Sequence, residues 1–367
     1  MHQGQRAFQS LAMSMVDDNL SFGNSGKYYA SAFAGDQRLL GDDRSRESGF
    51  LQDLLKTHNP ELRQRVERAF RQWNGIIRDY LRSEMGLRLT VGDDAQAVPV
   101  KIVAGLPEAL ADVYSRFPRE IWEILLRLPL LESTNWGLGF LVDYHWALEN
   151  RRLFHQPLDP PSHAEFCRVR DAVERILSSV KALKIDELLR TIPHDVLGAY
   201  FFRLPVIKLY WMAIGLISGM LGVEVEALTL VVASHELAHA YSHLGRDIDG
   251  ERWDTESFAK ADLCIAEGLA QFYTYAVCKK LEPRFPAAQK AYESLLQIQS
   301  GPYRVQESWL NDGKDKSAES QRVGEVIRAS MIECRAQRVT IYAKFASCIA
   351  HNRGVFSHKK APSTSSA

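Results

Sequence analysis

The segment S-H-E-L-A-H-A-Y-S-H-L-G, residues 234–245, contains the pattern H-E-x-x-H. The stretch before it holds neither Gly nor Pro, and Gly245 stands where a helix C-cap belongs, which predicts one helix over about 224–244. On a helix, His235 and His239 lie one above the other, so both imidazoles reach a single metal ion. This helix constrains the rest of the chain, because its neighbours must leave room for a metal.

The ligand face of this predicted helix also carries apolar residues, so the imidazoles are expected to point into the protein interior. Three apolar residues share the face: Val225, Leu228 and Val232. Neutral imidazoles suit zinc, which leaves coordination positions open and lowers the pKa of a bound water to near 7. Glu236 projects roughly 100° round the helix from His235. The pattern therefore predicts Zn²⁺ on His235 and His239, with Glu236 as the general base that activates water.

A catalytic zinc site needs a third protein ligand. On an unbroken helix, His243 stands about 12 Å from His235, too far for the same ion, which favours a structural or surface role. Downstream, Glu267 is a lone carboxylate in the apolar run 265–270, and an acid in such a setting normally has a partner. Gly268 beside it permits close approach of two helices. We expect Glu267 to be the third ligand; the alternative is a partly exposed helix charge.

The motif H-E-x-x-H at 235–239, followed by A-E-G-L-A at 266–270, resembles the gluzincin zinc metallopeptidases, whose third ligand is a Glu on a second helix. The resemblance covers about residues 195–280. The metzincin pattern is not matched, because Ser242 and Gly245 replace its Gly and its last His. The resemblance implies a zincin-like catalytic domain with a small β-sheet upstream of the H-E-x-x-H helix. It also implies cleavage of a protein or peptide substrate.

The resemblance has further implications for individual residues. Gluzincins commonly orient the first His with an acid four residues after the ligand Glu; here Gln271 takes that place, and its amide oxygen can accept the same bond. Residues 198–202 resemble the edge strand that pairs with substrate, although plain core strands are an equal alternative. Cys264 is expected to pack rather than to bind metal. The residue that assists the oxyanion is left open among four candidates: Tyr200, Tyr273, Tyr303 and His351.

Composition limits the classes of protein to consider. The 367 residues are 46% hydrophobic and 25% charged, as in ordinary globular proteins, with 45 basic and 45 acidic residues. Balanced charge disfavours nucleic acid or an anionic membrane as partner. Acidic residues are interspersed with a possible arginine stripe, which predicts a solvated face; the stripe comprises Arg68, Arg71, Arg78 and Arg82. The five cysteines are dispersed without C-x-x-C spacing, which favours a reducing, cytoplasmic location.

The expected fold class is α+β, predominantly helical. A β-hairpin is predicted from 87–91 and 98–103, followed by short helices broken by prolines and a hard break at Asp159-Pro160-Pro161. The uncharged run 209–223 is shorter than the ~20 residues of a membrane span and is predicted to be buried. Four segments are expected: a polar, partly disordered segment (1–49), a helical domain with the hairpin (50–160), the metallopeptidase domain (161–355) and a disordered tail (356–367).

These observations give a leading hypothesis of a soluble zinc-dependent peptidase. The alternative is a zinc-stabilised binding or regulatory protein without turnover. Retention of Glu236, which binds no metal, argues against that alternative, because a purely structural site does not require it. A nucleic-acid-binding protein that uses the arginine stripe is disfavoured by the balanced charge. The sequence makes no prediction of the substrate or of the oligomeric state.

Overall fold

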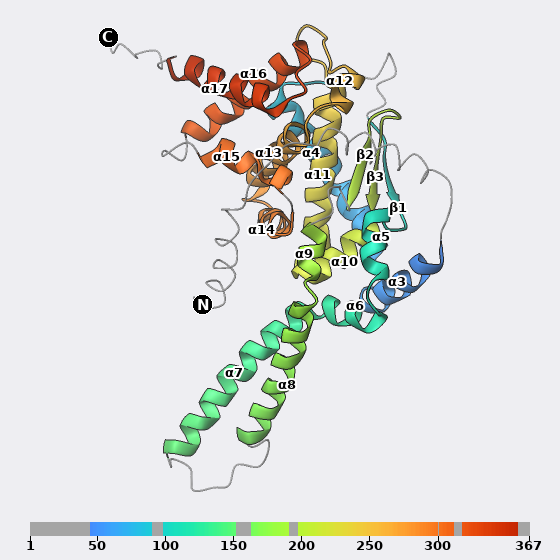
Figure 1. Ribbon diagram of the computed structural model, residues 1–367, viewed down its shortest axis with the longest axis vertical. Coiled ribbons are helices and arrows are strands. Elements are labelled where there is room, and N and C mark those ends of the chain that lie inside the picture. The colour runs from blue at the N-terminus through green and yellow to red at the C-terminus, as the bar shows by residue number, and fades with distance from the viewer. Residues whose placement is uncertain are drawn as a thin grey trace.

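The computed structural model of the chain describes residues 45–89, 98–151, 163–190, 197–299, 301–311 and 318–358. These residues form a predominantly helical α+β structure with one small sheet, which confirms the expected fold class (Figure 1). The predictions for most of the first 49 residues, and for the tail beyond 358, lie outside the described residues.

In chain order the elements are α3 (Ser45–His58), α4 (Leu62–Met85), β1 (Val100–Val103), α5 (Glu108–Ser115), α6 (Arg119–Leu126), α7 (Leu128–Arg151), α8 (His163–Ala182), α9 (Ile185–Arg190), β2 (Gly198–Phe201), β3 (Val206–Tyr210), α10 (Trp211–Leu221), α11 (Val225–Leu244), α12 (Thr255–Ala259), α13 (Leu263–Leu281), α14 (Pro286–Leu296), the 3₁₀ helix η2 (Gly301–Arg304), α15 (Gln306–Asn311), α16 (Ala318–Ala336) and α17 (Tyr342–His358).

Helix α11 is the centre of the structure, and all its residues except Glu226 and Leu244 are buried. Such a helix is apolar nearly all round and must be enclosed by other elements. Helices α4, α13, α14 and α10 and strand β2 surround it (Figure 1). Near its start, Arg65 of α4 donates two hydrogen bonds to Glu226, at 2.7 and 2.6 Å. Residues 50–160 therefore contribute directly to the framework around the H-E-x-x-H helix.

The sheet has the strand order β1-β3-β2, with β1 parallel and β2 antiparallel to the central strand β3. Val100 pairs with Ile207, so the predicted β-hairpin from 87–91 and 98–103 is wrong. Arg88 belongs to the first strand of that predicted hairpin. It instead forms an isolated bridge with Arg246, next to the end of α11. The alternating pattern identified β1 as extended, but it does not determine which strand pairs with it. The turn predicted between the two halves lies outside the described residues.

The uncharged run 209–223 forms the end of β3 and the helix α10, which begins at Trp211 without a loop. Its first eight residues are buried, as predicted for a core segment. Gly215 allows the close packing of α10 on α4, because a Cβ at Gly215 would collide with the Leu62 side chain. Among the described helices, none combines the length and the apolar character that crossing a bilayer requires.

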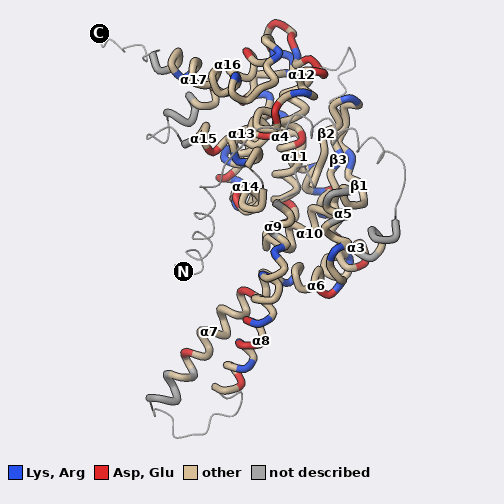
Figure 2. The backbone as a smooth tube through the Cα atoms, in the orientation of Figure 1, with Lys and Arg blue, Asp and Glu red and all other residues tan. Residues whose placement is uncertain are grey.

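Helices α7 and α8 form an antiparallel hairpin that projects from the body of the protein (Figure 1). The prediction that Pro129 breaks this region into short helices is wrong for α7, which runs for 24 residues. Pro129 lies in the first turn of α7, where its missing N–H has no helical partner to lose. Figure 2 shows acidic and basic residues interspersed along the hairpin and on the helices of the body.

The predicted solvated arginine face of α4 agrees with its observed contacts. Arg68 and Arg82 pair with nearby acids, Glu61 and Asp79, and all four side chains are mostly exposed. Arg78 instead turns inward and donates to the backbone oxygen of Val98, and to Asn74. Burial therefore lowers the pKa of Arg78. Arg68 and Arg82 thus form exposed ion pairs, whereas Arg78 makes hydrogen bonds inside the protein.

Candidate metal centre

The three expected ligands come from two helices that pack side by side. Helix α11 supplies His235 and His239, and α13 supplies Glu267. Helix α13 begins at Leu263 because Asp262 caps it, its Oδ1 accepting from the backbone N–H of Cys264 at 3.0 Å. Asp254, an earlier possible cap in the chain, begins the short helix α12 instead.

The ligand atoms form a compact triangle. Nε2 of His235 lies 3.1 Å from Oε2 of Glu267 and 3.1 Å from Nε2 of His239, and the third side of the triangle, His239 Nε2 to Glu267 Oε2, is 3.4 Å. The two imidazole rings are nearly perpendicular, at 88°. Ligands about 2.0–2.1 Å from a tetrahedral zinc lie about 3.3 Å apart. The triangle therefore has the dimensions of three corners of a zinc coordination tetrahedron.

All three side chains are buried, with relative exposures of 6% for His235, 4% for His239 and 3% for Glu267. Burial by itself raises the pKa of the Glu267 carboxyl, but the charge and hydrogen bonds of the two histidines lower it by more. The net result is a pKa below the usual range of a glutamate. Glu267 is therefore held as a carboxylate in an apolar interior, where a charge needs a compensating partner.

Glu236 is buried beside the triangle and faces strand β2. A Cβ atom built on Gly198 would come within 2.8 Å of both Cγ and Oε1 of Glu236, and within 2.9 Å of Cγ1 of Val232. The first residue of β2 thus packs directly on the glutamate. Sequence reasoning did not assign this contact, although a glycine within a strand is a known signal of close approach by another group.

Among the four candidates for assisting an oxyanion, the structure brings Tyr303 to the site. Its ring stacks on the imidazole of His235, with centroids 6.0 Å apart and planes 28° apart. Tyr200 instead hydrogen-bonds Nδ1 of His243 at 2.9 Å. Tyr273 is buried within α13, and no hydrogen-bond partner of its hydroxyl lies among the described residues. His351 is exposed on α17.

The position of Tyr303 follows from Gly268. A Cβ at Gly268 would collide with Cγ1 of Val305 and would come within 2.6 Å of the Trp309 ring. The predicted close approach at this glycine is therefore made by α15 and the residue preceding it, which pack on α13. This packing holds η2 over the ligand helices, with Tyr303 buried at 3% exposure.

His243 has the predicted structural role. Its side chain is fully buried and stacks on Phe258, with ring centroids 4.6 Å apart. Its Nδ1 lies 2.9 Å from the Tyr200 hydroxyl and its Nε2 lies 3.1 Å from Oγ1 of Thr255. Burial, together with the positive charges of Arg252 and Arg335, lowers the pKa of His243 to about 4. The ring is therefore neutral near pH 7 and joins β2, α11 and α12.

Two other residues near the triangle were assigned from the sequence. Burial, and then the nearby Asp262, raises the pKa of Cys264 to about 12, so its thiol stays protonated. Among the described residues, the group that could hold a metal ion consists of His235, His239 and Glu267 and does not include Cys264. The side-chain amide nitrogen of Gln271 donates to Gln299 at 3.0 Å. The expected bond from a histidine to the oxygen of Gln271 stays a prediction.

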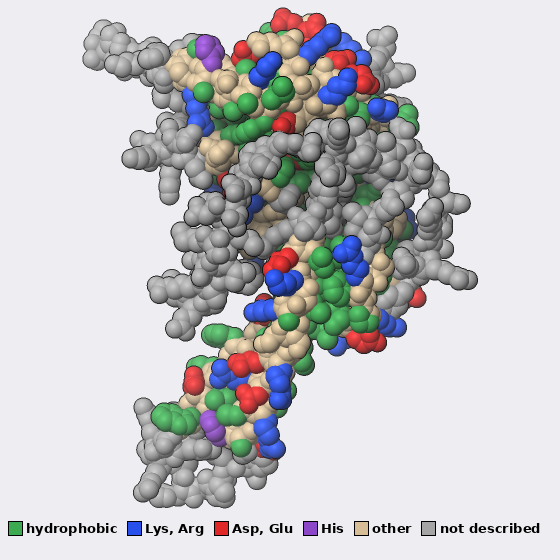
Figure 3. Space-filling model, in the orientation of Figure 1, with side chains coloured by type: hydrophobic (Ala, Val, Ile, Leu, Met, Phe, Trp, Pro, Cys, Tyr) green, Lys and Arg blue, Asp and Glu red, His purple; other side chains and the backbone are tan. Residues whose placement is uncertain are grey.

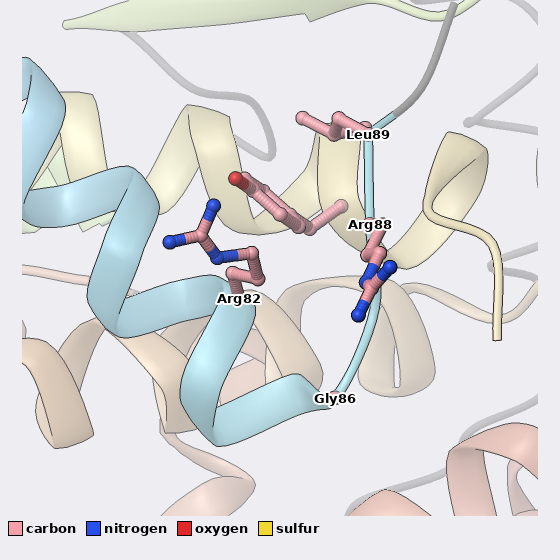
Figure 4. A pocket seen from close by; sticks show the side chains of 5 residues that line it. Arg82, Gly86, Arg88 and Leu89 are labelled. Atoms are coloured by element: carbon pink, nitrogen blue, oxygen red, sulfur yellow. The ribbon is translucent and has the colours of Figure 1, made fainter. Parts of the chain in front are cut away.

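A cavity of about 510 Å³ opens elsewhere on α11, lined by Arg82, Gly86, Arg88, Leu89 and Tyr241 (Figure 4). None of the three ligands lines it. Tyr241 follows His239 by two residues and so projects about 200° round the helix from it. This cavity and the ligand triangle therefore lie on different faces of α11.

No protein-family model matches the chain, and neither a curated protein nor a solved structure matches it. The chemical character of the site therefore rests on the ligand triangle and on the residues around it.

Proposed function

We propose that the protein is a zinc-dependent peptidase of the gluzincin type. His235, His239 and Glu267 would hold Zn²⁺, and the spacing of their ligand atoms fits that ion. Bound there, zinc supplies the Lewis acidity that activates water and polarises a carbonyl group. The observation that carries the proposal is a further buried carboxylate, Glu236, which directly follows His235 in the chain and is not one of the three residues that could hold the metal.

Glu236 is the proposed general base. Glu236 is not among the three residues that could hold the metal, and a purely structural metal site does not require an additional carboxylate next to its ligands. In the proposed reaction its carboxylate accepts a proton from the attacking water and passes that proton to the leaving amine. Its contact with Gly198 limits where the carboxylate can lie, which favours a single orientation.

The edge position of β2 supports a peptide substrate. The backbone N–H of Tyr210 donates to the carbonyl of Leu197 at 3.0 Å. Antiparallel pairing alternates along a strand, so the backbone groups of Ala199 point toward β3, and those of Gly198 and Tyr200 point away from the sheet. An extended peptide can pair with such an edge by adding a strand. Since Gly198 contacts Glu236, a peptide bound there would pass the proposed base.

Tyr303 is the proposed donor to the oxyanion that develops during peptide hydrolysis. It is the oxyanion candidate whose ring packs on a ligand histidine. A phenol hydroxyl placed near the reacting carbonyl can stabilise negative charge in the transition state. We also propose a cytoplasmic location, which is supported by five cysteines that are all free thiols.

The decisive experiment compares wild type with Glu236→Gln for metal content and for cleavage of a peptide library. Both proteins should hold about one zinc per chain, because Glu236 is not a ligand. Wild type should cleave peptides, and Glu236→Gln should lose on the order of 10² to 10⁴ in rate. If both proteins bind zinc and the same peptide but neither cleaves it, the non-catalytic binding protein replaces the peptidase. Elemental analysis also identifies which metal is bound, because iron too can be bound by two histidines and a carboxylate.

A further inference from the structure

Helix α7 carries two apolar stripes on opposite faces. One stripe is partly buried and lies where α7 packs along α8; it comprises Leu131, Asn135, Leu138 and Val142. The other follows a three-four spacing along the opposite face; it comprises Leu130, Ser133, Gly137, Phe140 and Tyr144. This alternation of three and four is the heptad spacing of helices that pair along their length. We call the second stripe the α7 seam.

The α7 seam is exposed, although its large residues are apolar. The relative exposures are 65% for Leu130, 64% for Phe140 and 52% for Tyr144, and Trp136 beside the seam is 76% exposed. Figure 3 shows hydrophobic side chains on the surface of the projecting hairpin. At roughly 200 Å² per aromatic side chain, the three aromatic residues expose roughly 400 Å². The largest apolar patch on a typical monomer is about 300–600 Å² and is often functional, so this cluster has the size of an interaction surface.

Gly137 lies in the middle of the seam. Glycine weakens a helix interior relative to alanine, and it leaves more room for a neighbouring molecule than any other residue would. At Gly215 and Gly268 a built Cβ collides with packed side chains, whereas at Gly137, as at Gly75 and Gly139, it meets nothing within 4 Å. The space above Gly137 is therefore open to another molecule.

We propose that the α7 seam pairs with the α7 seam of a second copy of this chain, in antiparallel orientation around a two-fold axis. In an antiparallel pair the heptad positions of the partner run backwards, so each seam residue meets a different residue of the partner. Gly137 then faces the partner's Phe140, and Ser133 faces the partner's Tyr144. Small residues meet large ones in both layers, and the same contacts repeat across the axis. A two-fold interface requires this self-complementarity.

The size and charge of the surface fit a second copy. Two such aromatic clusters, together with Leu130 and Leu141 of each copy, approach the 1,200 Å² or so that small specific interfaces bury. The hairpin carries both signs of charge, and exposed Arg168, Asp171 and Arg175 follow one another along α8. An anionic membrane surface selects basic clusters rather than mixed charges. A membrane is therefore the less suitable occupant.

Sedimentation velocity of the full chain over a range of concentrations measures the pairing. Wild type is expected to be a dimer, and Phe140→Glu is expected to weaken the dimer on the order of 100-fold, because symmetry buries two carboxylates. Glu132→Gln lies on α7 about 110° from the seam and is the matched control. It should leave the dimer unchanged. Circular dichroism checks that each variant keeps its helices.

Gly137→Leu gives a second test that loss of folding cannot explain. Leucine is a better helix former than glycine, so thermal stability of the monomer should rise. The same leucine fills the space proposed for the partner's Phe140, so the dimer should dissociate. A variant that is more stable and monomeric supports the proposal, whereas one that stays dimeric overturns it.

Cysteine cross-linking tests the orientation. A chain with Ser133→Cys mixed with a chain with Tyr144→Cys should form a disulfide-linked heterodimer under mild oxidation, beyond the level of wild type. Ser133→Cys alone should not cross-link to itself, because two copies of position 133 lie about 16 Å apart along the antiparallel pair. Self-linking of Ser133→Cys would indicate a parallel pair. A monomeric wild type would overturn the proposal; flotation with vesicles of phosphatidylcholine and phosphatidylserine would then identify a membrane as the occupant.

Discussion

Gly198 of β2 lies against the side chain of Glu236, so closely that a single added methyl group would come within 2.8 Å of Cγ and Oε1. The contact joins the edge of the sheet to the proposed general base. Both residues are buried, so neither can move away without disturbing its neighbours. The orientation of the Glu236 carboxylate therefore depends on the absence of a side chain at position 198.

Gly198→Ala should consequently impair catalysis without removing metal. The new methyl group pushes on Glu236 and Val232, and a displacement near 1 Å can cost on the order of 10² in rate. The measurements are kcat/KM on a cleaved library peptide and zinc per chain. Gly75→Ala on α4 is the matched control, because a Cβ there meets nothing within 4 Å. Equal activity of Gly198→Ala and wild type would show that this contact does not orient the base.

Glu267→Ala should weaken zinc binding by more than about 100-fold, beyond the range found for mutated outer-shell residues. The physical reason is the loss of the anionic corner of the ligand triangle. Competition with a chelator of known affinity measures the change. Cys264→Ser is the control from the same helix, and it should leave the zinc affinity unchanged because that thiol is protonated. A comparable loss of affinity in Cys264→Ser would instead indicate a structural site with four protein ligands.

Tyr303→Phe should reduce kcat by about 10² to 10³, the effect of removing one donor to an oxyanion, with a smaller change in KM. The ring and its stacking on His235 remain, so zinc content should stay at the wild-type level. Tyr273→Phe is the matched control, because it removes a buried hydroxyl for which the described residues provide no hydrogen-bond partner. Similar losses of kcat in both variants would exclude a specific role for Tyr303.

His243 should make stability depend on pH below neutrality. The pKa of His243 is about 4 in the folded protein, against about 6.5 in an unfolded chain. Between these values the unfolded chain binds a proton that the folded chain does not, so the free energy of unfolding falls as pH falls from 6.5 to 4. The full loss is on the order of 3 kcal/mol. Above pH 6.5 this contribution is constant.

Urea unfolding of the metal-free protein between pH 4 and 7 measures this dependence. His243→Phe keeps a ring against Phe258 and should be less stable, because it removes both hydrogen bonds of the imidazole. Its stability should nevertheless fall less steeply with decreasing pH than that of wild type. All other ionisable groups are the same in both proteins, so their contributions cancel in the comparison. Identical slopes would show that His243 does not supply the pH dependence.

The three ligand residues could be predicted from the sequence because the patterns that identify them are local. The predicted helix 224–244 agrees with α11, and Glu267 was identified as a charge within an apolar run, which burial makes costly. The structure then placed it 3.1 Å from His235. The contact of Gly198 with Glu236 was not predicted, because it joins two elements whose relative placement no local pattern specifies.

The errors have the same physical origin. Alternation identified residues 98–103 as extended, but a strand that can pair on either edge does not reveal its partner, and β1 pairs with β3. Proline inside a helix breaks it, yet Pro129 lies in the first turn of α7, where a proline costs no hydrogen bond. Asp254 and Asp262 are both good caps, and each begins a helix of its own, α12 and α13 respectively.

The ion pair between Arg65 and Glu226 joins residues that are 161 positions apart in the chain. The packing of α11 on α4 therefore closes a very long loop, and such contacts form slowly because chain entropy opposes them. During synthesis α4 is made first, the two histidines follow, and Glu267 comes last. Until α13 docks, only two ligands are available, so we expect tight zinc loading to be a late step in folding that marks a completed core.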